Sequence, residues 1–169
     1  TKVWLLAGVE SDASEPGDYF LFNLGHESII VTRTDAGALS AVYNVCQHRG
    51  NRILTGELGS VSGFSCPYHG WRYDLDGALA EVPDRERFQQ GVPCDRLSLK
   101  PVQVDSWAGL VWINMDPDAP PLTEFLGVIR EQLTPYHFEK MVLVRHQTCA
   151  LDANWKTVID NFNEQYHVD

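Results

Sequence analysis

Two short segments of the chain each offer one thiol and one imidazole at close spacing. The first is Cys46-Gln-His48 and the second is Cys66-Pro-Tyr-His69, with 17 residues between His48 and Cys66. Thiolates and imidazoles are ligands for soft and borderline transition metals, so two such loops make a set of four donors. The sequence therefore predicts a metal centre bound by Cys46, His48, Cys66 and His69.

Two kinds of metal centre accept this donor set. A two-iron cluster can be bound asymmetrically, with two cysteines on one iron and two histidines on the other. A structural zinc also takes two cysteines and two histidines, but its loops usually pair Cys with Cys and His with His. Each loop here mixes the two and ends in a glycine, Gly50 or Gly70, which permits a tight backbone bend. The pattern favours the iron–sulfur cluster.

The segments around the ligands, VYNVCQHRGN and FSCPYHGWRYDLDGAL, closely resemble the Rieske domain of ring-hydroxylating oxygenase α subunits. The resemblance extends over most of 17–114 and implies a [2Fe-2S] cluster. Respiratory Rieske proteins carry an extra cysteine in each loop, and a serine hydroxyl where this chain has Trp71. Without that hydroxyl we expect a reduction potential near the low end of the Rieske range, about −150 mV.

A second group of polar residues lies near the end of the chain. Asp160, Glu164 and His167 fall on one stripe of a predicted helix, because they are spaced by four and three residues. The apolar positions form a separate face, made of Trp155, Val158, Ile159, Phe162 and Tyr166. By itself this pattern also fits an exposed salt-bridge pair, Glu164 with His167, on an amphipathic helix.

The segment that starts at Asn154-Trp155-Lys156 resembles the catalytic-helix motif of the same oxygenase family. The resemblance implies that His167 is the first ligand of a mononuclear iron and that Glu164 bridges His167 to His69 of a neighbouring subunit. The expected catalytic residues are Glu164, Asn161 and Asp160. The remaining histidine and carboxylate of a 2-His-1-carboxylate site would lie beyond Asp169, so we expect the chain to be part of a longer one.

The elements that must position these residues are mostly short β-strands. Turn signals at 34–37 and 74–77, each ending in glycine, separate runs with strand-like composition. These runs are YFLFNL, ESIIVTR, ALSAVYNV, VSGFSC, WRYDL, LKPVQVDSW and GLVWINM. The predicted fold class is therefore mainly β: a Rieske-type antiparallel β-sandwich, followed by the start of an α+β catalytic domain.

A proline-rich stretch at 116–121 divides the predicted domains. Residues 1–115 are assigned to the Rieske domain, 116–121 to a linker, and 122–169 to the beginning of the catalytic domain. Within that last part, Thr123 is expected to cap a helix over 124–133, and MVLVRHQTCAL is expected to form a strand. Cys94 and Cys149 lack histidine neighbours and are expected to be buried, inert thiols.

Composition and charge exclude several classes of function. The net charge is −10, and no basic stripe is present that could bind a nucleic acid. The sequence contains neither an apolar run of membrane-spanning length nor the pattern of a signal peptide, so we expect a cytoplasmic protein with no membrane partner.

The combined expectation is the terminal oxygenase component of a multicomponent Rieske non-haem iron oxygenase. The resemblance implies that a ferredoxin or reductase supplies electrons and that a mononuclear iron activates O₂. It also implies that an organic substrate, expected to be aromatic, is hydroxylated by mono- or dioxygenation. It also implies a homotrimer. A stand-alone Rieske ferredoxin, which would have no need of the 154–167 segment, and a zinc-stabilised binding module are the alternatives.

Overall fold

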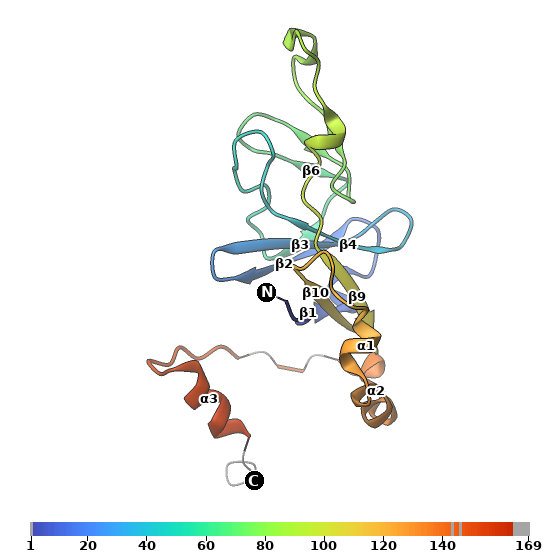
Figure 1. Cartoon of the computed structure of the whole chain (residues 1–169), viewed down its shortest axis with the longest axis vertical. Coiled ribbons are helices and arrows are strands. Elements are labelled where there is room, and N and C mark those ends of the chain that lie inside the picture. The colour runs from blue at the N-terminus through green and yellow to red at the C-terminus, as the bar shows by residue number, and fades with distance from the viewer. Residues whose placement is uncertain (1, 143, 146, 164–169) are drawn as a thin grey trace.

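The computed structural model of the chain describes residues 2–142, 144, 145 and 147–163. Within these residues the chain forms three small antiparallel sheets, as the mainly β prediction requires (Figure 1). One sheet has the order β1 (Leu5–Val9), β10 (Leu110–Asn114), β9 (Gln103–Trp107). The second has the order β4 (Leu39–Tyr43), β3 (Glu27–Arg33), β2 (Asp18–Leu24), β5 (Leu58–Ser60). The third is β6 (Phe64–Ser65), β7 (Arg72–Tyr73), β8 (Leu79–Glu81).

Strand β3 lies between two hydrophobic cores, because both of its faces are buried. Side chains of a strand alternate between the two faces of its sheet. Ile30 accordingly packs into one core, which also contains the two loop cysteines, while Ile29 and Val31 pack into a second core against β10. The sheet that contains β3 therefore separates the loop region, near β6, from the β1-β10-β9 sheet (Figure 1).

The two predicted hairpin turns are confirmed and share one geometry. In the first, Gly37 has φ +79° and its amide donates to the Thr34 carbonyl. In the second, Gly77 has φ +90° and its amide donates to the Asp74 carbonyl in the same way. Their surroundings differ: a Cβ on Gly77 would lie 2.8 Å from Val42 Cγ1, whereas a Cβ on Gly37 would meet nothing within 4 Å.

The helical region after the prolines differs from the prediction. The expected single helix is divided into α1 (Leu122–Leu126) and α2 (Ile129–Leu133), because Gly127 takes φ +49° and ends α1. Thr123 lies inside α1, whose N-cap is Pro121, so the capping prediction was wrong. Helix α1 is held on the β-structure by Leu122 and Leu126, which bury against Trp4.

The predicted strand at 141–151 is absent among the residues of that segment that the structure describes. A strand needs a partner for its backbone hydrogen bonds, and Val142 and Val144 are instead exposed. The predicted helix after Asn154 is confirmed as α3 (Trp155–Phe162), and the Asn154 side chain accepts a hydrogen bond from the Lys156 amide. No helix in the described part of the chain has the length and apolarity needed to cross a membrane.

The paired turns generate a stability test. Gly77→Ala should lower the free energy of unfolding by about 2–4 kcal/mol, because positive φ strains alanine and the new methyl group overpacks Val42. Gly37→Ala carries the strain without the clash and should cost only about 1–2 kcal/mol. Thermal unfolding followed by circular dichroism measures both, and equal midpoints for the two variants would contradict the packing argument.

Candidate metal centre

The two loops that contain the candidate ligands are closed by the same pair of hydrogen bonds. In the first loop the Gly50 amide donates to the Cys46 carbonyl at 2.9 Å, and the Cys46 amide donates to the Asn51 carbonyl at 2.9 Å. In the second loop the Gly70 amide donates to the Cys66 carbonyl at 3.0 Å, and the Cys66 amide donates to the Trp71 carbonyl at 2.8 Å.

The loops are thus the same size although their motifs differ. Gly50 and Gly70 have φ of +70° and +71°, a left-handed conformation that costs glycine little. Only the position of the histidine changes, since His48 is two residues after its cysteine and His69 is three residues after its own. This shift places the two imidazoles differently on otherwise equivalent loops.

The fold brings the candidate ligands together in pairs, the two histidines and the two cysteines. The rings of His48 and His69 meet edge to face, with centroids 4.6 Å apart. Cys46 and Cys66 are both buried at 2% exposure in one core cluster, and both are free thiols. Burial raises the pKa of the Cys46 thiol, and the neighbouring Cys66 thiol raises it further. A bound metal would overcome this preference for the neutral thiol, because it binds the thiolate.

The two histidines have different surroundings. The ring of His48 is half-buried and stacks on Trp71, with centroids 4.9 Å apart and planes within 6°. Burial lowers the pKa of His48, and the charges of His69 and Arg49 act in the same direction. His69 is exposed, and its ring also lies against that of Tyr68, at 3.8 Å between centroids. The site therefore has one imidazole on its inner side and one at the surface.

The residues fit a bound metal cluster in one further respect. The Nδ1 atom of His48 is buried and has no hydrogen-bond partner in the described structure, which is a costly state for a polar atom unless a ligand fills it. No group of three or more His, Cys, Asp or Glu side chains in the described part of the chain is placed to hold a single ion. This agrees with a Rieske cluster, in which each iron has only two protein ligands.

Tyr73 is a residue of the site that was not predicted from the sequence. This residue follows the second loop on β7, is 1% exposed, and places its hydroxyl oxygen 3.2 Å from Cys46 Sγ. The same oxygen accepts a hydrogen bond from the Gln47 amide at 3.1 Å. Tyr73 thereby joins the second loop to the first. Burial, followed by the bond to Cys46, raises the pKa of Tyr73.

Asn44 is a second missed residue, and it fixes the chain on both sides of the first loop. It follows β4 and is 1% exposed. Its side-chain oxygen accepts from the amides of Ile53 and Leu54, at 3.0 and 2.9 Å, and its side-chain nitrogen donates to the Leu54 carbonyl and to Ser28 Oγ. Because Cys46 and His48 lie between Asn44 and Ile53, this one side chain closes the segment that carries both ligands.

The structure describes two of the predicted residues near the end of the chain and not the other two. Asp160 and Asn161 lie on α3 and are exposed. Glu164 and His167 lie outside the described residues, so their placement stays a prediction. Two other expectations were wrong: Cys94 is only half-buried, and Cys149 is exposed.

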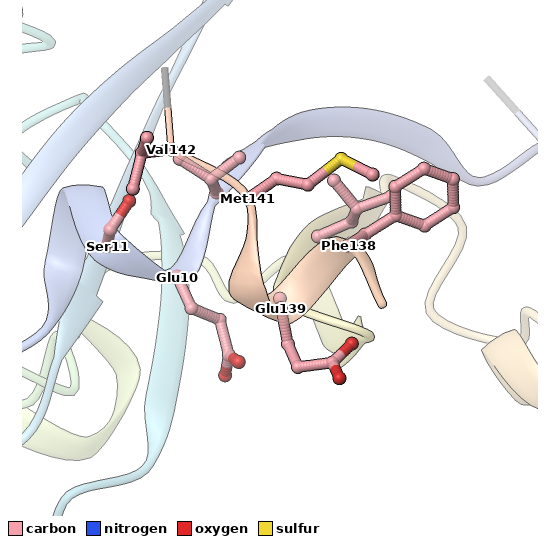
Figure 2. Close-up of a pocket in the computed structure, with 9 residues that line it drawn as sticks. Glu10, Ser11, Phe138, Glu139, Met141 and Val142 are labelled. Atoms are coloured by element: carbon pink, nitrogen blue, oxygen red, sulfur yellow. The ribbon is translucent and has the colours of Figure 1, made fainter. Parts of the chain in front are cut away.

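A separate cavity of about 320 Å³ lies where the segment after α2 meets the β-structure, away from the ligand loops. Figure 2 shows the side chains of Phe138, Met141 and Val142 in the upper part of the view, whereas the carboxylates of Glu10 and Glu139 both point toward the lower part. Glu10 is already paired with Arg33 at 3.6 Å. The sequence argument gave no signal for this cavity.

The comparisons with known proteins agree with this centre. Residues 3–103 match the Rieske [2Fe-2S] domain, and residues 138–169 match the catalytic domain of the ring hydroxylating alpha subunit. The chain therefore belongs to the Rieske [2Fe-2S] domain family, and that family implies a [2Fe-2S] cluster.

Individual relatives are longer than this chain. It is 34% identical over 168 residues to the glycine betaine monooxygenase oxygenase subunit of Pseudomonas aeruginosa (strain UCBPP-PA14), covering 98% of this chain and 38% of that protein. It superposes on a quaternary ammonium Rieske monooxygenase in complex with L-carnitine with a TM-score of 0.91, at 32% identity, covering 98% and 47% of the two chains. For a naphthalene 1,2-dioxygenase mutant bound to phenanthrene, the TM-score is 0.75 at 35% identity, covering 79% and 30%.

Removing the Asn44 side chain tests how far it supports the first loop. Asn44→Ala leaves the Ile53 and Leu54 amides and the Leu54 carbonyl without this partner, and each unsatisfied buried group costs about 1–3 kcal/mol. We expect the free energy of unfolding, measured by urea denaturation, to fall by about 3 kcal/mol. Asn23→Ala, at an exposed position of β2, is the control and should unfold like the wild type. An equally small effect at Asn44 would mean that water replaces its hydrogen bonds.

Proposed function

We propose that the chain binds a [2Fe-2S] cluster through Cys46 and Cys66 on one iron and His48 and His69 on the other. The two matched loops, the free buried thiols and the unpartnered Nδ1 of His48 support this assignment. In this proposal residues 1–115 form the Rieske domain, 116–121 the linker, and 122–169 the start of the catalytic domain. When bound, such a cluster supplies one-electron transfer.

We further propose that the protein is the terminal oxygenase component of a multicomponent Rieske non-haem iron oxygenase. One observation carries this proposal: Rieske ligand loops and a segment matching the ring hydroxylating catalytic domain occur in the same chain. An electron carrier alone, the stand-alone ferredoxin alternative, has no use for the second segment. A ferredoxin or reductase would be the electron donor, and O₂ the co-substrate.

The second iron site of this proposal lies toward the end of the chain. His167 would be the first ligand of a mononuclear non-haem iron, which supplies O₂ activation when bound. Glu164 would accept N–H groups from His167 and from His69 of the neighbouring subunit, and Asp160 and Asn161, in the last turn of α3, lie four and three residues before it in the chain. The exposure of His69 supports this role, because a buried ring could not reach a second subunit. Such sharing requires an oligomer, and a head-to-tail arrangement can close as a ring. We propose that this ring is a trimer.

Two substrate classes are candidates. A small quaternary ammonium compound is supported by the superposition over 98% of the chain on a monooxygenase of that class. An aromatic compound, the class expected from the sequence, is supported by the likeness to naphthalene 1,2-dioxygenase over 79% of the chain. Product analysis with both classes offered to the protein and its electron donor distinguishes them.

The cluster proposal is tested by composition and by cysteine replacement. The purified chain should be red-brown and contain about two irons and two inorganic sulfides. Cys46→Ser and Cys66→Ser should each abolish the colour, whereas Cys94→Ser and Cys149→Ser should keep it, because those two thiols lie outside the ligand loops. Stoichiometric zinc without sulfide would refute the cluster and support a zinc-stabilised module.

The catalytic proposal is tested at Glu164 in a protein that contains both iron sites. Glu164→Gln should leave both metals loaded and the Rieske cluster reducible, yet reduce product formation to near zero, because the bridge between His69 and His167 loses its charge. Iron content, the spectrum of the reduced protein and product yield are measured together. Normal turnover by an intact oligomer of the variant would return Glu164 to the role of an exposed charge on an amphipathic helix.

A further inference from the structure

The indole of Trp4 is hydrogen-bonded to the proline-rich stretch at 116–121. Trp4 is 6% exposed, and its Nε1–H donates to the Pro120 carbonyl at 2.9 Å, although 116 positions separate the two residues in the chain. An indole nitrogen only donates, and a buried indole N–H without an acceptor is costly. The Pro120 carbonyl therefore satisfies the one polar group of this buried side chain.

A second carbonyl of the same stretch is held by β9. Gln103 Nε2 donates to the Pro117 carbonyl at 2.8 Å. Pro117, Pro120 and Pro121 also have ring-locked φ angles, and proline-rich connections act as semi-rigid spacers. The 116–121 stretch therefore joins the two parts of the chain with little freedom to bend.

Helix α1, which follows this stretch, packs on Trp4 beside the β1-β10-β9 sheet (Figure 1). Leu122 and Leu126 are 0% and 5% exposed and form one apolar cluster with Trp4. Trp107 on β9 and Trp112 on β10 pack against this cluster from the sheet. Three tryptophans thus form the apolar surface that holds α1.

The chain returns to the same sheet after α2. The rings of Trp107 and Phe138 meet edge to face, with centroids 6.4 Å apart. A Cβ on Gly109, in the turn between β9 and β10, would lie 3.0 Å from Glu139 Cα, so the turn and this residue are in close contact. The match to the catalytic domain begins at residue 138. Its first residues therefore lie directly on the β9-β10 hairpin.

We propose that Trp4 holds the Rieske and catalytic parts of one chain at the orientation that a head-to-tail ring of subunits requires. This inference rests on the proposed function, in which His69 of one subunit meets Glu164 of the next. Each subunit then presents one of these residues on its Rieske part and the other on its catalytic part. The angle between the two parts sets the angle between neighbouring subunits, and a ring closes only at a rotation that fits. Trp4 is a positioning residue in this role, because it acts through the 116–121 stretch.

Trp4→Phe tests the inference, because it keeps a ring in the cluster and removes the N–H donor. Trp112→Phe is the matched control: its indole packs against the same cluster, but its Nε1 has no hydrogen-bond partner in the described structure. In Trp4→Phe the hydrogen-exchange protection of the Phe125 and Gly127 amides, which are hydrogen-bonded in α1, should fall relative to the control. The expected loss is about tenfold, because one hydrogen bond changes the opening equilibrium by about that factor.

The oligomer supplies a measurement that a purely local role of Trp4 would not change. In a protein that contains both iron sites, loosening of this connection lowers the fraction of chains with the competent orientation, and the apparent dissociation constant of the oligomer rises accordingly. Sedimentation over a range of concentrations should show weaker assembly for Trp4→Phe than for Trp112→Phe. The cluster midpoint should be the same in both, because Cys46 and Cys66 lie in a different core cluster from Trp4.

The outcomes separate this inference from the proposed function. A wild-type protein with both iron sites that stays monomeric would refute the head-to-tail arrangement itself. An oligomeric wild type whose assembly is matched by Trp4→Phe would overturn the role of Trp4 alone, whatever happens to the α1 amides. If Trp4→Phe does not fold, benzothienylalanine at position 4 keeps the size of the indole and replaces its N–H by sulfur. The same weakening of assembly is expected for that protein, and its absence would overturn the inference.

Discussion

The architecture around the metal site depends on one repeated backbone constraint, the closure of each ligand loop by a glycine amide on a cysteine carbonyl. Both closures require a left-handed residue four positions after the cysteine, and Gly50 and Gly70 supply it. Each cysteine amide is also committed, to Asn51 in one loop and to Trp71 in the other. The backbone groups of both cysteines and the amides of both glycines are therefore already hydrogen-bonded, and the side chains of the cysteines and histidines are left available for a metal.

The two ligand loops have the same size but carry their histidines at different positions, so the two sides of the site differ in exposure. His48, two residues after its cysteine, turns inward and is covered by Trp71. His69, three residues after its cysteine, remains at the surface beside Tyr68. In the proposed oxygenase, the surface histidine faces the neighbouring subunit, while the inner histidine and both thiols are shielded from water. A difference of one residue in spacing thus accompanies the difference between the exposed histidine and the one that packs on Trp71.

Local chemistry made the hairpins predictable and pointed to the candidate ligands, whereas contacts between distant segments could not be predicted. The Cys and His spacing and the glycines of the 34–37 and 74–77 turns are written in consecutive residues, and the structure has both turns. Tyr73 and Asn44 were missed because their partners lie 27 and 10 residues away, at Cys46 and Leu54. The expected strand at 141–151 failed for a related reason: apolar, β-branched residues favour a strand only where a neighbouring strand pairs with them.

The double burial of β3 keeps the ligand site apart from the second core. Ile29, Ile30 and Val31 are completely covered, from both faces of the strand, and β3 pairs with β2 on one edge and β4 on the other. Cys46 and Cys66 are buried in the core on the Ile30 side, whereas the core between β3 and β10 contains neither. A substitution at either cysteine therefore disturbs one core directly and leaves the other packed.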